Sequence, residues 1–173
     1  MKIALVVASK NFRDEEYFIP YQIFKEKGMD LSVFSDKKGT IIGVYGGEGE
    51  AEHVLKELDS KNFAAVIFVG GPGAMKFLDN EEGYEIARKA KKEGTLLAAI
   101  CISPLILAKA EVLKGVEATV WSSPLDKSSV NILKEKGGVY RDEDVVQDGK
   151  IITANGPEAS EIFSWRVVDS LMS

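Results

Sequence analysis

Cys101 is the only cysteine in the chain, and its neighbours are of the kind that surround a reactive thiol. The run from Thr95 to Ile100 is mostly apolar and predicts a short buried strand. Ser103 and Pro104 favour the start of a helix, so Cys101 falls where a strand ends and a helix begins. This pattern predicts a nucleophile elbow, in which the helix N-terminus favours a thiolate. The alternative is a buried Cys that acts only as a small apolar residue.

Two further segments carry polar or glycine-rich sequence at the ends of predicted strands. The first strand ends at Ser9 and leads to the polar run from Arg13 to Glu16, where either Glu15 or Glu16 is a candidate to share a proton with the thiol. The alternative is that these acids only stabilise the first turn of a helix. Because parallel strands end at one edge of a sheet, these groups are expected to lie near Cys101.

The other segment is the turn from Gly70 to Gly73, which follows an apolar strand. Glycines let the backbone approach closely and expose N–H groups, so this turn and the N–H of Ile102 are candidates to hold an oxyanion. The alternative is a tight turn with no role in binding. The glycines do not match the dinucleotide-binding pattern.

His53, the only histidine, lies in a polar segment far along the sequence from these pieces. A solvated surface position is therefore expected, and a Cys–His dyad within one chain is unsupported. One His, one Cys and scattered acids show no ligand spacing for a metal. We expect neither a metal nor a cofactor.

The composition is that of an ordinary globular domain. The chain has 173 residues and a formal net charge of −5, with 45% apolar and 28% charged residues. We expect a single domain spanning residues 1–173. No block of Lys and Arg favours nucleic acid or an anionic membrane as a partner. A lone Cys is typical of a reducing cytoplasm, and the apolar run at the N-terminus is too short for a signal or membrane segment.

Strands alternate with helices along the chain, which predicts a mostly parallel sheet with helices on both faces. Asp148-Gly149 between two apolar runs predicts an antiparallel hairpin over 145–152. Other expectations are a helix opening at Asp14, a capping box with Asp79 as the cap, and a weak helix over 50–58. The sequence also predicts a helix from the elbow to about 113, a strand over 117–121, a helix from 123 to 134 and a last helix starting at Gly156-Pro157.

Four motifs in this order resemble the PfpI/ThiJ family, a branch of the class I glutamine-amidotransferase-like superfamily that includes the Parkinsonism-associated deglycase. They are Met1 to Pro20 with its acidic turn, Val69 to Gly73, Ala98 to Pro104, and Gly156-Pro157. The resemblance implies a flavodoxin-like three-layer α/β sandwich and a homodimer or larger homo-oligomer.

The resemblance also implies roles for particular residues. Cys101 would be the elbow nucleophile, and Glu16 matches the family's acid that hydrogen-bonds the cysteine. Gly71 and Ile102 match the backbone donors of the oxyanion site. Gly70, Ser123 and Asn155 are possible auxiliary residues.

The chain departs from the family at three positions. Protease-like members carry His directly after the Cys, where this chain has Ile102, and the Gly that follows is Ser103 here. Deglycase-like members carry a His before Pro where this chain has Ser123. Neither family base is present, and Ile cannot accept a proton.

Three functions remain open. The first is glyoxalase- or deglycase-type chemistry on a small carbonyl by Cys101, with Glu16 as the general acid and base. The second is a non-catalytic redox sensor or stress-response protein, in which an oxidant converts Cys101 to the sulfinate. The third is an intracellular cysteine peptidase, which would need His53 delivered from a neighbouring subunit.

Overall fold

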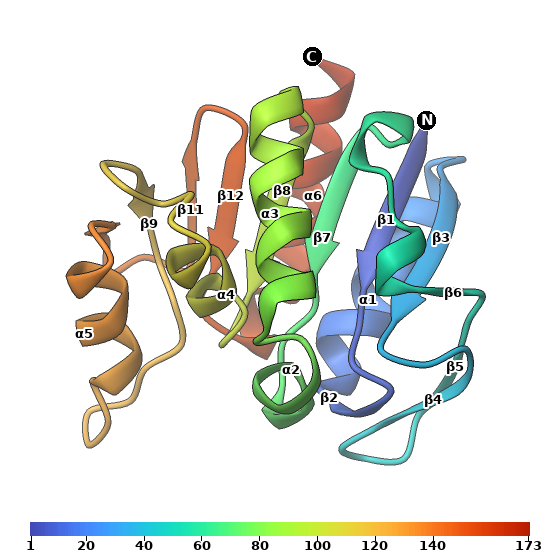
Figure 1. The fold of residues 1–173 in the computed structure, drawn as a ribbon, viewed down its shortest axis with the longest axis horizontal. Helices are drawn as coiled ribbons and strands as arrows, with labels where there is room; N and C mark the ends of the chain where they lie inside the picture. Colours follow the sequence, from blue (N-terminus) through green and yellow to red (C-terminus); the bar gives the residue numbers. More distant parts are fainter.

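The computed structural model describes residues 1–173. Its centre is a seven-stranded sheet (Figure 1). The strands, in spatial order, are β11 (Val145–Asp148), β12 (Ile151–Ala154), β8 (Leu96–Ile100), β7 (Ala65–Phe68), β1 (Lys2–Val6), β3 (Asp30–Ser35) and β6 (His53–Val54). All neighbouring strands pair in parallel except β11 and β12, which form the antiparallel hairpin that the sequence predicts.

Helices cover both faces of this sheet, which makes three layers. In Figure 1, α3 (Glu81–Glu93) and α4 (Pro104–Lys109) lie in front of the sheet, and α1 (Asp14–Glu26) and α6 (Ser160–Met172) lie behind it. α5 (Ser128–Glu135) packs against α4 at one end. The flavodoxin-like α/β sandwich expected from the sequence is confirmed.

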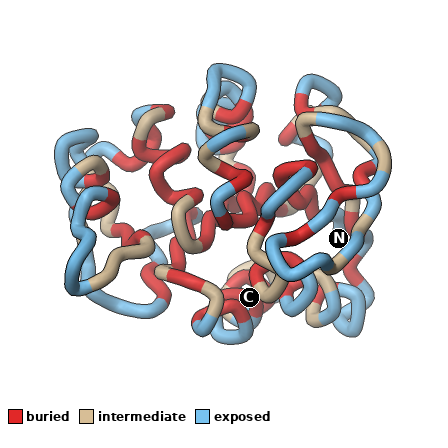
Figure 2. Tube along the Cα trace, turned by 90° about the horizontal axis from the view of Figure 1, so that it is seen from below, coloured by how far each residue is buried: buried red, intermediate tan, exposed pale blue.

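The alternation of side chains along β1 shows how one strand supplies two cores. Ile3, Leu5 and Val7 belong to the apolar cluster shared with α1 and α6, whereas Ala4, Val6 and Ala8 belong to the cluster beneath α3 and α4. Successive side chains of a strand point to opposite faces, so a strand covered on both sides must be apolar throughout. Figure 2 shows the result, with buried segments through the middle and exposed loops around them.

Short elements surround the sheet. They are the three-stranded sheet of β2 (Lys10–Phe12), β4 (Gly39–Gly43) and β5 (Glu48–Ala51), the pair β9 (Glu117–Ala118) and β10 (Val139–Tyr140), the helix α2 (Pro72–Phe77), and the 3₁₀ turns η1 (Leu55–Glu57), η2 (Ser60–Asn62) and η3 (Pro157–Ala159). None of the helices has the length and apolarity needed to cross a membrane.

The segment 50–58 is not the weak helix predicted from the sequence. It forms the end of β5, the short strand β6 and the turn η1. β6 adds to the edge of the central sheet beside β3, with His53 opposite Phe34. Pairing with an existing strand edge therefore overrides the local propensity.

The helix α3 is capped by Asn80 and not by Asp79. The Asn80 side chain accepts a hydrogen bond from Gly83 N at 3.2 Å. Asp79 instead pairs with Lys109 of α4 and accepts a bond from the Tyr84 hydroxyl. The acid that the sequence assigned to the cap therefore links α3 to α4.

Several predicted boundaries differ from the structure. The helix after Cys101 ends at Lys109 and not near residue 113, and the strand predicted over 117–121 pairs only over its first two residues. The helix predicted from 123 begins at Ser128. The last helix starts with the turn η3 before α6. Pro20 lies inside α1, which nevertheless runs from Asp14 without a later start.

Candidate active site

Cys101 occupies the first position after β8, with a backbone φ of +64°. A left-handed conformation is uncommon for a residue other than Gly, and such residues gather at functional sites. Two hydrogen bonds hold the conformation: Cys101 N donates to Ala154 O at 2.9 Å, and Trp121 N donates to Cys101 O at 2.8 Å. The backbone is therefore a sharp strand-to-helix turn that carries a half-buried thiol.

Ser103 fixes the far side of this turn. It is fully buried, and its Oγ donates a hydrogen bond to Val69 O at 2.7 Å instead of capping α4. Val69 follows β7, so the bond ties the elbow to the end of the neighbouring strand. The residue expected to begin the helix thus uses its hydroxyl to hold the elbow against β7.

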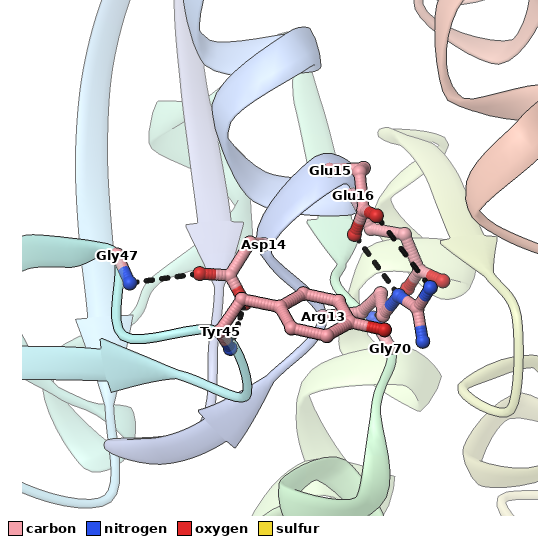
Figure 3. A network of polar contacts seen from close by, with 7 residues as sticks. All are labelled: Arg13, Asp14, Glu15, Glu16, Tyr45, Gly47 and Gly70. Carbon is pink, nitrogen blue, oxygen red and sulfur yellow. Dashed lines mark hydrogen bonds and ion pairs between the residues drawn. The ribbon is translucent and has the colours of Figure 1, made fainter.

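Glu16 extends from the first turn of α1 into the interior, where it is fully buried. Its Oε2 accepts a hydrogen bond from Gly70 N at 2.9 Å (Figure 3). Its Oε1 has no hydrogen-bond partner, and the Cys101 thiol is the neighbouring group with which it can exchange a proton. Burial raises the pKa of Glu16 to about 7, although the thiol and the Gly70 N–H act in the opposite direction.

The same environment raises the pKa of the Cys101 thiol. Burial is the main cause, and the facing carboxylate of Glu16 adds to it. The backbone N–H groups of Ile102 and Gly71 point at the sulfur and lower the pKa by a smaller amount. The N–H groups at the start of the helix therefore favour the thiolate as expected, but burial and Glu16 outweigh them and the net shift of the thiol pKa is upward.

Gly70 lies in the narrow space between these two side chains. A Cβ on Gly70 would come within 2.4 Å of Glu16 Oε2, 2.6 Å of the carbonyl oxygen of Ile100 and 2.7 Å of Cys101 Cβ. Contacts this short do not occur, and the backbone carbonyl cannot move aside. Only Gly at position 70 therefore lets the backbone N–H that follows β7 lie against the carboxyl group of Glu16.

Gly71 directs a second N–H toward the sulfur. Its φ of +109° belongs to the region that favours Gly, and a Cβ there would lie 2.5 Å from Arg13 N. Gly71 precedes α2, a helix that the sequence did not predict. Together with the N–H of Ile102, it provides the two donors that an oxyanion beside Cys101 would need.

A pocket of about 580 Å³ opens beside the thiol. Its lining comprises Arg13, Gly71, Pro72, Met75, Cys101, Ile102, Trp121, Ser122, Asn155, Gly156, Pro157 and Glu158. Most of these residues follow β7, β8 and β12, whose carboxyl ends meet at one edge of the sheet. Arg13 follows β2, and Trp121 and Ser122 follow β9. The volume suits a small organic molecule.

The other residues singled out in the sequence lie in different places. Asn155 lines the pocket, and its Nδ2 donates to Asp144 at 3.2 Å. Ser123 lies outside the lining, where its Oγ accepts a hydrogen bond from Asp126 N at 3.0 Å. His53 stacks on Phe34 at the far edge of the sheet and does not line the pocket.

Arg13, Ser122 and Trp121 are among the lining residues that the sequence did not predict. Arg13 stood in the acidic run but was not considered for the pocket, and Ser122 rather than its neighbour Ser123 faces the cavity. Trp121 was assigned to a strand, and its backbone instead bonds the elbow. Each of the three lies one or two positions from a residue that the sequence singles out, Glu15 or Ser123. No group of three or more His, Cys, Asp or Glu side chains is placed to hold a metal ion.

Comparisons with known proteins agree with this fold. The deglycase PfpI of Pyrococcus furiosus is 32% identical over 165 residues, which cover 95% of each chain. An uncharacterized protein of Methanocaldococcus jannaschii is 34% identical over 171 residues, covering 98% of this chain and 82% of the relative.

The crystal structure of a ThiJ/PfpI domain protein from Brachyspira murdochii superposes with a TM-score of 0.93 at 32% identity. The superposition covers 99% of this chain and 96% of that one. The DJ-1/PfpI family pattern matches residues 1–170. The chain therefore belongs to the DJ-1/PfpI family.

Proposed function

We propose that the protein is a cysteine-dependent enzyme that acts on small electrophilic carbonyl compounds, with glyoxalase- or deglycase-type chemistry. The observation that carries this proposal is the buried carboxyl group of Glu16. It is bonded to Gly70 N and has one oxygen free beside the Cys101 thiol, at the edge of a pocket of about 580 Å³. The name of the Pyrococcus furiosus relative, a deglycase, supports the same reaction class.

The first step joins the thiol to an α-oxoaldehyde such as methylglyoxal. The sulfur of Cys101 forms a bond to the aldehyde carbon while Glu16 accepts the thiol proton. The former carbonyl oxygen becomes an alkoxide, which the N–H groups of Gly71 and Ile102 are placed to stabilise. Glu16 then returns the proton to this oxygen, which gives a neutral hemithioacetal. An early adduct of the aldehyde with an amine would reach the same hemithioacetal, with release of the free amine.

The second step moves a proton within the hemithioacetal. Ionised Glu16 takes the proton from the carbon that bears sulfur and delivers it to the adjacent carbon, while the hydroxyl proton passes to the adjacent carbonyl oxygen. These two transfers convert the hemithioacetal into a thioester. Water then hydrolyses the thioester to lactate and frees the thiol. The overall change is the addition of one water to methylglyoxal, so no oxidant or reductant is needed.

The test is lactate formation from methylglyoxal by the wild type, Cys101→Ala and Cys101→Ser. Lactate formation is a better readout than loss of methylglyoxal, because Lys and Arg side chains consume methylglyoxal without forming lactate. We expect turnover in the wild type and none in either variant, since neither Ala nor a neutral Ser forms the thioester. Equal lactate formation by the wild type and Cys101→Ala would contradict the proposal.

The structure gives less support to the other two functions. A redox sensor requires a thiolate that reacts with peroxide, and burial together with Glu16 raises the pKa of the Cys101 thiol. A peptidase requires a base at the thiol, and no His lines the pocket of the single chain. We further propose, from the family resemblance, that the chain forms a homodimer or larger homo-oligomer.

A further inference from the structure

Arg13 is the one cationic side chain that lines the pocket with Cys101. It immediately precedes α1, three residues before Glu16, and its backbone N donates to Gly70 O at 3.0 Å. This bond fixes the start of the Arg13 side chain to the strand end that also holds Glu16. A cation placed in this way beside a nucleophile favours ligands that carry a negative charge.

Two neighbours hold the guanidinium in place. Glu15 accepts hydrogen bonds from Nε at 2.9 Å and from Nη2 at 3.5 Å, and the ring of Tyr45 lies 4.9 Å from Cζ. Tyr45 is itself fixed, because Asp14 accepts hydrogen bonds from Tyr45 N at 2.8 Å and from Gly47 N at 2.9 Å (Figure 3). The loop between β4 and β5 therefore packs the Tyr45 ring against Arg13. Contacts with Glu15 and Tyr45 therefore restrict the guanidinium before any ligand arrives.

One edge of the guanidinium remains open. Glu15 takes the Nε side, and no protein acceptor bonds Nη1. The Arg13 side chain is 31% exposed, so the open Nη1–Nη2 edge is accessible from the pocket. This edge is the one that binds a carboxylate with two parallel hydrogen bonds. Glu158, the one acid of the lining, is exposed at the surface and makes no ion pair with Arg13.

We propose that Arg13 binds a carboxylate of the substrate, so that the pocket selects small carbonyl compounds that carry a carboxylate near the electrophilic carbon. This inference rests on the proposed carbonyl chemistry for its substrate class, but the anion binding is measurable without turnover. The single guanidinium has one open edge beside its contact with Glu15, which matches one carboxylate and not a phosphate dianion, which prefers several cations.

The lone cysteine makes a direct test available. Iodoacetate and iodoacetamide both alkylate only Cys101 under limiting conditions, with a new S–C bond and loss of iodide, and they differ mainly in the carboxylate. The ratio of their rates, followed by intact mass, isolates recognition of the anion from the reactivity of the thiol. A misfolded variant is visible in the same experiment, because its iodoacetamide rate changes as well.

Three variants test the site: two should lower the ratio of the iodoacetate rate to the iodoacetamide rate, and one should raise it. Arg13→Met should lower the iodoacetate-to-iodoacetamide ratio by about three- to tenfold, the size of one partly exposed charge-assisted bond. Arg13→Lys should lower it less, because Lys keeps the charge but not the paired donors. Glu15→Gln should raise the ratio, because it removes the negative charge from the guanidinium. The matched control is Lys25→Met, which removes the same charge from the other end of α1.

A second measurement uses a carbonyl compound. Glyoxylate should protect Cys101 from iodoacetamide in the wild type at concentrations several-fold lower than in Arg13→Met, whereas neutral glyoxal should protect both equally. An unchanged rate ratio in Arg13→Met, or an equal fall in Lys25→Met, overturns the inference.

The two proposals fail separately. If the alkylation rate ratio depends on Arg13 but no lactate forms, the anion site is supported and the carbonyl chemistry is rejected. Lactate formation with an alkylation ratio independent of Arg13 rejects the anion site alone.

Discussion

Glu16 carries an ionisable group into the interior without an ion pair to neutralise it. One Oε2 hydrogen bond from Gly70 N does not offset the loss of hydration, so the pKa of the carboxyl group rises to about 7. Near neutral pH the group is therefore present in both protonation states. This property suits a group that must first accept and then return a proton.

The first prediction at the residue scale concerns pH and turnover. Lactate formation should increase as pH rises through about 7, because the proposed steps need Glu16 ionised to accept the thiol proton. Glu16→Gln should lower turnover by roughly 100-fold or more and remove this rise, since an amide accepts no proton. A pH profile of the wild type and the variant is the measurement. An undiminished rate in Glu16→Gln would reject the assigned role.

The same shift predicts a dependence of stability on pH. Glu16 has a folded pKa of about 7 against a reference of 4.5, so the folded state binds its proton more tightly. The stabilisation by this group is complete below about pH 4.5 and is lost as pH rises to about 7. The difference in unfolding free energy, wild type minus Glu16→Gln, should fall by about 3 kcal/mol over that window. Urea unfolding at both ends measures it, and Glu15→Gln, from the same turn, should keep the wild-type dependence.

At the scale of elements, three strand-to-helix connections converge on the site. β1 leads to α1 with Glu16, β7 leads to α2 with Gly70 and Gly71, and β8 leads to α4 through Cys101. β7 lies between β1 and β8 in the sheet, so its end separates the carboxyl group from the thiol. The space available at Gly70 therefore sets how closely the two reactive groups approach.

Gly70→Ala tests this arrangement. The added methyl group would displace Glu16 and the elbow, because Ile100 O at 2.6 Å is backbone and cannot rotate away. We expect the unfolding free energy to fall by about 1 to 3 kcal/mol, as for other overpacked sites. The matched control is Gly156→Ala, whose Cβ would meet only Trp121 Cδ1 at 3.7 Å, an ordinary contact. Equal losses in the two variants, by chemical denaturation, would show that the narrow space at Gly70 is not the cause.

At the scale of the whole molecule, the sheet separates the only histidine from the only cysteine. Cys101 follows β8 and His53 lies in β6, with β7, β1 and β3 between them. Four steps between neighbouring strands span roughly 19 Å, too far for an imidazole to reach the thiol within one chain. A base from His therefore requires a second copy of the chain.

The corresponding prediction combines mass and activity. Sedimentation equilibrium should give a multiple of 18.9 kDa, as the family resemblance implies, and a mass of 18.9 kDa at all concentrations would contradict it. His53→Ala should leave lactate formation unchanged, because Glu16 and not His53 is the assigned proton carrier. Peptide hydrolysis that disappears in His53→Ala would instead favour the peptidase assembled between subunits.

The sequence by itself determined the parts of this protein that depend on neighbours along the chain. An apolar strand, one Cys, a small residue and Pro predict the elbow, and the alternation of strands and helices predicts the layered sheet. Spacing did not separate Glu15 from Glu16. Adjacent helical residues point about 100° apart, so only the docking of α1 decides which one enters the interior.

The tertiary structure also decided the features that depend on burial. It turned Glu15 toward Arg13 and buried Glu16 beside Gly70, and it raised the pKa of the thiol that local helix chemistry alone would lower. It placed Arg13 in the pocket through a backbone bond to Gly70 and through Tyr45, which is 32 positions farther along the chain. Desolvation and contacts between distant segments arise only when the sheet assembles, which is why the residue pattern predicts the elbow but not its electrostatics.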